Sequence, residues 1–145
     1  MKVFNKKAKF NYELLDKYET GVVLTGPEVK SVKRGHLSLK ESYVKLIQEE
    51  LWLIGVNINP YKFADNTDYD PTRTRKLLMH KKQIQLLQRK METGNLTLVP
   101  TAIYTKNHRI KVEIALARGK KEYQKKETKK RRDLDRETQR ILKRY

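Results

Sequence analysis

Residues 110–116 have the sequence IKVEIAL, which gives the clearest secondary-structure signal in the chain. Every second side chain is a large aliphatic one, beginning with Ile110, and the residues between them include Lys111 and Glu113. This period-two alternation is typical of a β-strand with one buried face and one face in water. The length of 145 residues predicts a single domain, and this strand belongs to its core.

Further strand signals lie on the N-terminal side of this segment. Residues 10–14 alternate apolar and polar side chains, and residues 22–24 are apolar, with Gly21 before them, which predicts one strand that bends. A tight turn at Glu49–Glu50 is expected to join two more strands. These and a further predicted strand occupy residues 43–48, 51–58 and 96–104.

Two helices are predicted between the strands. Pro27 suits the first position of a short helix, and Gly35 suits the residue just past its end. After a long loop rich in Pro, Asn and Asp, a longer helix is expected to begin, with Asp70 or Thr72 as its cap, and to end at Gly94. Its apolar stripe consists of Leu77, Ile84, Leu87 and Met91.

The arrangement of these elements predicts a mainly β fold. Several short antiparallel strands with two or three helices, in fewer than 120 residues, favour a small antiparallel β-barrel, because closure of a sheet removes its exposed edges. The OB-type barrel commonly binds oligonucleotides on its face and loops. We therefore expect an OB-like RNA-binding barrel over residues 1–118 and a separate basic tail over residues 119–145.

The tail differs from the body in composition. Residues 119–145 hold 12 basic and 5 acidic residues, whereas residues 1–118 hold 22 basic and 12 acidic residues. Five apolar residues in the 27 of the tail are too few to form a core, but Lys, Arg, Glu and Gln are good helix formers. We expect the tail to be disordered when free and helical when an anionic surface neutralises it.

The formal net charge of +17 predicts a polyanionic partner. Basic residues are spread along the whole chain rather than gathered on a helix with a broad apolar face, which favours nucleic acid over a membrane, and RNA over DNA. The longest clear apolar run, Leu51 to Val56, has six residues, against about 18 for a membrane span. No apolar stretch follows the N-terminal charges, so we expect a cytoplasmic protein without a secretion signal.

Several kinds of active site are disfavoured. The absence of cysteine excludes a disulfide scaffold, a zinc site with cysteine ligands and a thiol nucleophile. The histidines lack partners at metal-ligand spacing, and the aspartates lack the glycine and closing glutamate of a calcium loop. We expect no enzyme, metal or cofactor; Glu19 and Glu28 could serve a nuclease only in principle. The histidines are His36, His80 and His108, and the aspartates are Asp65, Asp68 and Asp70.

Most aromatic residues lie within strand patterns, and we favour a core position for them over stacking on bases. Tyr123 is different, because it stands in a basic segment where burial cannot explain it. The residues for which the core is favoured are Tyr12, Tyr18, Tyr43, Trp52, Tyr61 and Tyr104.

Five strings closely resemble the small protein B family, the tmRNA-binding proteins of bacterial trans-translation. They are NKKA (5–8), YETG (18–21), GPEVKSVKRG (26–35), DPTRTRKLL (70–78) and KVEIALARGKK (111–121). The resemblance implies an OB-like barrel that binds the tRNA-like domain of tmRNA. It further implies delivery, with elongation factor Tu and GTP, to the A site of a stalled ribosome, where the tail occupies the empty mRNA path.

Carried over position by position, the tmRNA-contact cluster of the family falls on Glu19, Leu78 and His80, the last in place of a common Asn. Leu78 lies about 100° around the predicted helix from Leu77, which favours an exposed contact, while a core position stays open. Glu19 cannot bind phosphate, but it could accept from base N–H or 2′-OH groups or position a neighbouring cation. Basic residues of the matching strings are further candidate contacts: Lys6, Lys7, Arg73, Arg75 and Lys76.

In the tail, the resemblance implies contacts with the ribosome, although Gln124 stands where the family usually has Asp. The alternative function is that of a general OB-barrel rRNA-binding protein or RNA chaperone, which would bind many RNAs comparably. In either case we expect a monomer. The candidate ribosome-binding residues are Lys120, Lys121, Tyr123, Lys125, Lys126, Lys129, Lys130, Arg131 and Arg132.

Overall fold

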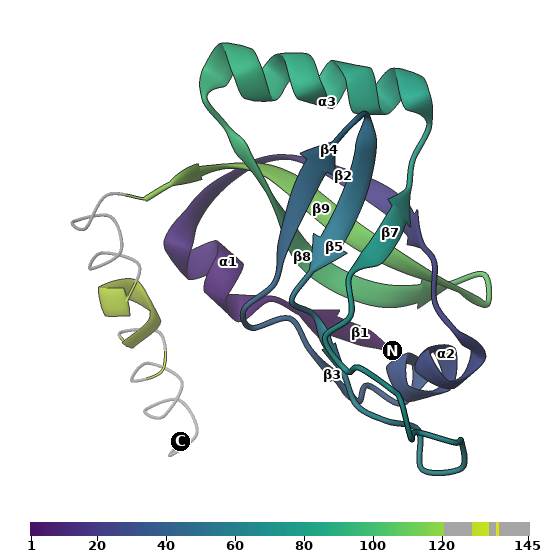
Figure 1. Ribbon diagram of the computed structural model, residues 1–145. Coiled ribbons are helices and arrows are strands. Elements are labelled where there is room, and N and C mark those ends of the chain that lie inside the picture. Colours follow the sequence, from purple (N-terminus) through teal and green to yellow (C-terminus); the bar gives the residue numbers. More distant parts are fainter. Residues whose placement is uncertain (121–128, 134–135, 137–145) are drawn as a thin grey trace.

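The computed structural model of the protein describes residues 1–120, 129–133 and 136. Strands dominate the first 119 residues, with three helices between them, which confirms the predicted mainly β fold (Figure 1). The elements in chain order are β1 (Lys2–Phe4), α1 (Lys6–Asn11), β2 (Tyr12–Val22), α2 (Gly26–Lys33), β3 (Leu37–Ser38), β4 (Tyr43–Ile47), β5 (Glu50–Ile54), β6 (Asn57–Ile58), β7 (Arg75–Leu78), α3 (Lys81–Gly94), β8 (Thr97–Lys106) and β9 (Arg109–Gly119).

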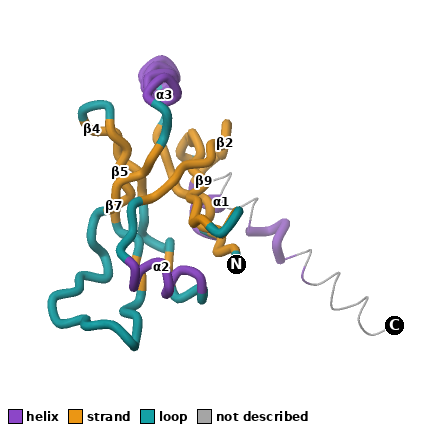
Figure 2. The backbone as a smooth tube through the Cα atoms, turned by 90° about the vertical axis from the view of Figure 1, so that its right-hand side faces the viewer, coloured by secondary structure: helices purple, strands orange, loops and turns teal. Residues whose placement is uncertain are grey.

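Seven strands form one antiparallel sheet in the order β1-β8-β4-β5-β7-β2-β9. Because β9 also pairs with β8 along most of its length, six of these strands close into a ring, as the sequence predicts. β1 pairs with the C-terminal half of β8, on the edge where β4 pairs with Leu98. α3 lies across one end of the ring, and α2 lies toward the opposite end (Figures 1 and 2).

The ring encloses an aliphatic core. Its completely buried side chains come from most strands of the ring, and Ile84 and Leu87 of α3 close one end. Burial of each such side chain stabilises the fold by about 1.5–3 kcal/mol. Strand residues of this core include Leu51, Leu53, Leu77, Leu98, Val112, Ile114 and Leu116.

The short helix α2 follows its prediction closely. The Thr25 side chain accepts from the backbone N–H of Glu28, and the Glu28 carboxylate accepts from the backbone N–H of Thr25, so the two residues form a capping box. Pro27 occupies the first turn. Gly35 follows the helix with φ +75°, a left-handed conformation that favours glycine.

The start of the longer helix differs from the prediction, because Arg75–Leu78 forms β7 and α3 begins only at Lys81. Asp70 caps a turn instead, accepting from the backbone N–H of Thr72 at 3.0 Å. β7 supplies the strand that the ring needs between β5 and β2. Leu77 therefore belongs to a strand of the core and not to a helical stripe.

Two turns also differ in detail from their predictions. The β4–β5 hairpin turns at Gln48 and Glu49, both with positive φ (51° and 62°), rather than at Glu49 and Glu50. Such conformations match the right-handed twist of the paired strands. At Gly55, φ is +82° and an added Cβ would lie 2.6 Å from the Glu41 carbonyl oxygen, so this position favours glycine. The backbone leaves the extended conformation here, and the strand predicted over residues 51–58 is divided into β5 and β6.

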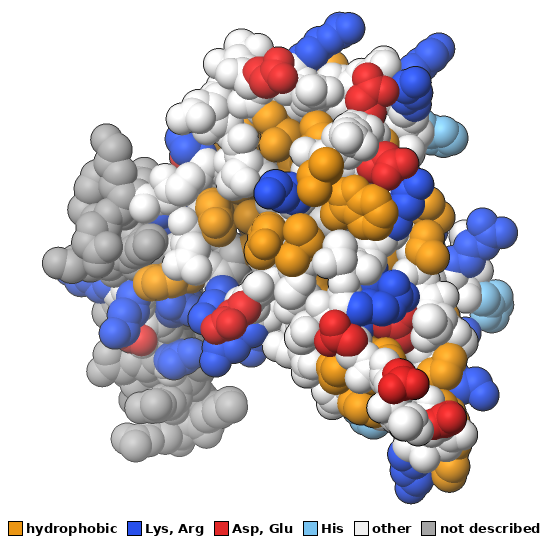
Figure 3. Space-filling model, in the orientation of Figure 1, with side chains coloured by type: hydrophobic (Ala, Val, Ile, Leu, Met, Phe, Trp, Pro, Cys, Tyr) orange, Lys and Arg blue, Asp and Glu red, His pale blue; other side chains and the backbone are white. Residues whose placement is uncertain are grey.

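The expected core position of the aromatic residues is observed only in part, since no aromatic side chain among the described residues is fully buried. Tyr18 packs partly against the main core, and Tyr12 against a smaller cluster under α1. Tyr43 is 50% exposed on the β4–β5 hairpin, where hydrophobic side chains lie among lysines and arginines (Figure 3). Within the described part of the chain, no helix has the length and apolar character needed to cross a membrane.

Candidate RNA-binding surface

Glu19 and Leu78 lie on the same side of the sheet. Leu78 of β7 pairs with Gly21 of β2, and Glu19 precedes Gly21 by two residues, so all three face outward. Leu78 is 50% exposed, whereas its neighbour Leu77 is 1% exposed. Leu78 is therefore a surface residue, and strand alternation rather than a helical angle is the reason.

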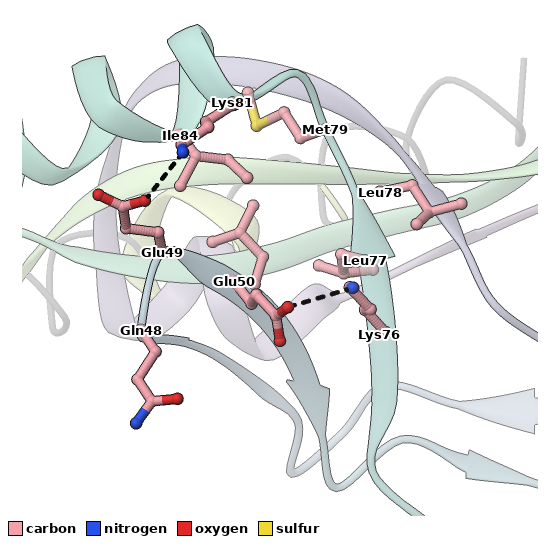
Figure 4. A pocket seen from close by; sticks show the side chains of 10 residues that line it. Gln48, Glu49, Glu50, Lys76, Leu77, Leu78, Met79, Lys81 and Ile84 are labelled. Carbon is pink, nitrogen blue, oxygen red and sulfur yellow. Dashed lines mark hydrogen bonds and ion pairs between the residues drawn. The ribbon is translucent and has the colours of Figure 1, made fainter.

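The Leu78 side chain separates two shallow hollows. One, of about 380 Å³, lies between the β4–β5 turn and the start of α3 (Figure 4). The other, of about 290 Å³, is lined by Gly21 together with Arg109 and Lys111. A Cβ at position 21 would lie 3.3 Å from the Cβ of Leu78, so glycine there leaves room for the leucine. A partner could therefore enclose Leu78 from both sides.

Two ion pairs border the larger hollow. Lys76 contacts Glu50 at 3.4 Å, and Lys81 contacts Glu49 at 3.6 Å (Figure 4). All four side chains are at least two-fifths exposed, and exposed pairs of this kind contribute little to stability. Lys76 can therefore exchange its contact with the Glu50 carboxylate for a contact with a phosphate.

The Glu19 carboxylate is held by residues of β8. The Tyr104 hydroxyl donates to its Oε2 atom at 2.5 Å, and Lys106 Nζ lies 3.4 Å from the same oxygen. The hydrogen bond from Tyr104, followed by the effect of Lys106, holds the pKa of Glu19 below its usual range. Glu19 is thus a charged acceptor at neutral pH.

A row of outward-facing residues crosses five strands. In register, Lys2 pairs with Tyr104, Tyr104 with Lys111, Lys111 with Gly21, and Gly21 with Leu78. Lys2 Nζ lies 5.2 Å from the centre of the Tyr104 ring and 5.0 Å from that of Phe4. Lysines for phosphates and rings for bases are the chemistry of RNA binding. We call this surface the outer face: Lys2, Phe4, Glu19, Gly21, Leu78, Tyr104, Lys106 and Lys111.

Several residues of the outer face are missing from the sequence prediction. Lys2, Phe4, Lys106 and Lys111 are not among its candidates, and it favours the core for Tyr104. Alternation along β9 indicates that Lys111 points outward, but a single sequence does not reveal which strands become neighbours.

The other candidates of the body are scattered around this surface. His80 is the exposed residue that precedes α3, and its side chain makes no capping hydrogen bond to that helix. Because β7 and β2 are antiparallel, the residues that follow Leu78 run in the direction that leads from Gly21 to Glu19 along β2. Lys6 and Lys7 are exposed on α1. Asn5 caps the start of this helix, because its side-chain oxygen accepts from the backbone N–H of Ala8.

Arg75 does not belong to any RNA-contacting surface, which corrects its prediction. Its side chain has no exposed surface, and its Nε donates to Glu28 at 2.7 Å. The remaining donors bind the carbonyl oxygens of Val56 and Pro71, at 2.8 and 3.0 Å. The guanidinium is therefore fully occupied inside the protein.

Glu28 joins Arg75 to Arg73, which retains 34% exposure of its side chain. Burial raises the pKa of Glu28, but hydrogen bonds from Arg73, from the Thr25 backbone and from Arg75 outweigh that effect and lower it. We call Glu28, Arg73 and Arg75 the buried charge cluster. The described residues contain no group of three or more acidic or histidine side chains that could hold a metal ion.

In the described part of the tail, Lys120 is half-buried, whereas residues 129–133 and 136 are exposed and mostly basic. The backbone N–H of Lys120 donates to the Asn11 carbonyl at 3.0 Å, and residues 129–133 form a helical segment. In this segment the Arg132 guanidinium lies 5.1 Å from the ring centre of Phe10 on α1. Lys129, Lys130 and Arg131 are also exposed here, whereas Lys121, Tyr123, Lys125 and Lys126 lie outside the described residues.

The chain is similar in sequence and fold to known proteins of one family. The family model described as SmpB protein matches residues 2–144. The SsrA-binding protein of Sulfurihydrogenibium sp. (strain YO3AOP1) is 50% identical over 139 residues, 96% of this chain and 91% of that protein. That of Solidesulfovibrio magneticus is 50% identical over 141 residues, 97% of this chain and 92% of that protein.

A solved structure gives the same result. A chain of the structure described as "tmRNA-SmpB: a journey to the center of the bacterial ribosome" is 40% identical, with a TM-score of 0.68. The match covers 83% of this chain and 85% of that chain. By sequence over nearly its whole length and by fold, the chain belongs to the SmpB family.

Proposed function

We propose that this protein binds the tRNA-like domain of tmRNA through its outer face and delivers it to the A site of stalled ribosomes for trans-translation. The observation that carries the proposal is a carboxylate, Glu19, fixed among lysines and aromatic rings on one sheet surface. A surface that bound only phosphates would not need an acidic residue at its centre. The names of the relatives, SsrA-binding proteins, support the same partner.

Each type of side chain on the outer face has a part in this binding. Lys2, Lys106 and Lys111 neutralise phosphates, and Phe4, 62% exposed, offers a ring for stacking. Leu78 packs against the ribose or base of a nucleotide that enters its flanking hollows. Lys6 and Lys7 extend the basic surface along α1.

The tail serves a second anionic surface, the ribosome. Residues 1–118 form the RNA-binding body, and residues 119–145 occupy the vacant mRNA channel near the decoding centre of the small subunit. Its basic residues neutralise rRNA phosphates, and Tyr123 stacks on a ribosomal base. Elongation factor Tu with GTP accompanies the complex. The protein acts as a monomer in the cytoplasm, and its role is binding rather than catalysis.

A binding competition tests the body. Labelled tRNA-like domain of tmRNA, ordinary tRNA and single-stranded RNA compete for the full-length protein at near-physiological salt. We expect a clear preference for the tRNA-like domain. Comparable binding of all three would leave a general RNA-binding protein or chaperone, the alternative function.

A truncation tests the tail. A chain that ends at Lys120 keeps the backbone hydrogen bond to Asn11 and all strands of the ring. Circular dichroism first checks that it folds. Affinity for the tRNA-like domain should then stay nearly intact, while tagging of nascent chains on stalled ribosomes should be lost. A large loss of affinity in the folded, truncated protein would assign the tail to tmRNA instead.

A further inference from the structure

Tyr104 reaches Glu19 across an intervening strand. Glu19 lies in β2 and Tyr104 in β8, and β9 runs between these strands with Lys111 and Glu113 facing the same side. The hydroxyl nevertheless donates to Glu19 Oε2 at 2.5 Å. The contact spans two strand spacings, and it holds the carboxylate of β2 from β8, on the far side of β9.

The interactions leave one oxygen of Glu19 available. Both Tyr104 and Lys106 contact Oε2, and no residue of the described chain donates to Oε1. A carboxylate can accept several hydrogen bonds, so Oε1 can still bind a donor from a partner. Because the side chain is already held, less rotamer freedom is lost when that donor arrives.

Like charge makes this positioning necessary. Glu19 stands directly opposite Glu113 on β9, and like charges in this register repel. β8 supplies a hydroxyl to each carboxylate, from Tyr104 to Glu19 and from Thr101 to Glu113 at 2.9 Å. Lys106 and Lys17 add a positive charge beside Glu19 and Glu113 respectively.

Tyr104 itself is held as a donor. Burial, together with the hydrogen bond to the Glu19 carboxylate, raises the pKa of Tyr104 well above its usual value, so the hydroxyl keeps its proton. Lys2 Nζ lies over the ring face, 5.2 Å from its centre, and makes a cation–π contact with it.

We propose that Tyr104 is a positioning residue, which fixes Glu19 so that its Oε1 atom accepts a hydrogen bond from a base N–H or a 2′-OH of the RNA. This inference rests on the proposed function. Since a fixed carboxylate repels phosphate and accepts only from donors, the Tyr104–Glu19 pair contributes specificity rather than general RNA affinity. Removing the hydroxyl should therefore reduce discrimination between RNAs.

The test is a double-mutant cycle with Tyr104→Phe and Glu19→Gln in the full-length protein. Affinities are measured for the tRNA-like domain and for an unrelated RNA hairpin. Tyr104→Phe should weaken binding of the tRNA-like domain about five- to tenfold and leave hairpin binding within about twofold. In the Glu19→Gln protein, the same change should have less than about a twofold effect.

Two controls separate positioning from structure. Tyr43→Phe removes the hydroxyl of another half-exposed tyrosine, one that makes no hydrogen bond within the described residues, and it should change neither affinity. The melting temperature of Tyr104→Phe should stay within about two degrees of the wild type. The dependence of affinity on salt should also keep its slope, because no phosphate contact is removed.

The outcomes distinguish this inference from the proposed function. If the wild-type protein does not prefer the tRNA-like domain over the hairpin, the proposed function itself fails. If the preference exists but Tyr104→Phe retains it, or if the two substitutions act additively, the positioning role is wrong. Equal losses for both RNAs, with a lower melting temperature, would make Tyr104 a structural residue.

Discussion

Glu28 and Glu19 each accept hydrogen bonds from two side chains, but Glu28 is buried and Glu19 lies at the surface. Glu28 accepts from Arg73 and Arg75, and Tyr69 lies beside it, with its hydroxyl 3.4 Å away. Glu19 accepts from Tyr104 and Lys106. The Glu28 side chain has no exposed surface, whereas that of Glu19 is 36% exposed.

Because they differ in burial, Glu28 has a structural role and Glu19 is available for binding. A buried carboxylate cannot recover hydration when its partner is lost, so Glu28 and Arg75 are required for the fold. An exposed carboxylate keeps access to water and to ligands, so Glu19 contributes little to stability and can serve RNA. Residue type alone does not separate them.

The largest expected effect is that of Glu28→Gln, which leaves Arg75 as an uncompensated buried charge. We expect a loss of about 3–5 kcal/mol in the free energy of unfolding, measured by chemical denaturation. Glu19→Gln, the matched change on the outer face, should leave the free energy of unfolding nearly unchanged. Equal losses for the two variants would remove the contrast between the clusters.

The pH dependence of stability sharpens the same contrast. The pKa of Glu28 is lowered in the folded protein, so its contribution is fully present above the unfolded value near 4.5. The contribution is lost as the pH falls through the lower folded-state pKa. Denaturation between about pH 6 and 3 should therefore show a decline in the wild type that is smaller in Glu28→Gln.

Adjacent leucines of β7 give the next largest effect. Leu77→Ala creates a cavity in the core and should cost about 2–5 kcal/mol of stability. Leu78→Ala should leave stability within about 1 kcal/mol and instead weaken binding of the tRNA-like domain. If Leu78→Ala lowers the melting temperature and leaves RNA affinity unchanged, Leu78 is a packing residue after all.

The fold was predictable wherever the signal is local. The alternation in residues 110–116 and the capping residues around α2 require no knowledge of distant segments, and both predictions are confirmed. β7 escaped prediction because it is only four residues long and because Arg75 occupies an inward position. A buried arginine needs a buried acidic partner, and the partner of Arg75 is Glu28, 47 residues earlier in the sequence.

The candidate site was predictable only in part, and for the same reason. Glu19 and Leu78 were identified by resemblance to a family, and the structure places both on one surface. Tyr104 contacts Glu19 across 85 residues of sequence, so no local pattern marks it as a surface residue. Long-range strand pairing determines which side chains meet, and composition alone predicts only that RNA is bound.

A smaller effect concerns the lysines of α1. Lys6→Gln removes one exposed cation from the proposed RNA-binding body. It should lower affinity for every RNA by a similar factor and reduce the slope of log affinity against log salt by about 0.9. Lys6→Arg keeps the charge and should keep the slope. A loss confined to the tRNA-like domain would instead indicate a specific contact at Lys6.

The smallest expected effect is that of Glu50→Gln, which breaks the exposed pair with Lys76. Both side chains are more than two-fifths exposed, so stability should change by less than about 0.5 kcal/mol. Loss of the carboxylate leaves Lys76 without an internal competitor for phosphate, so RNA affinity should rise slightly, by about twofold or less. Lys76→Gln should lower affinity to a similar degree, and the double variant should resemble Lys76→Gln. Denaturation and salt-dependent binding measure both quantities. A loss of stability comparable with that of Glu28→Gln would mean that exposed pairs also hold this fold together, and that burial does not separate structural from functional carboxylates here.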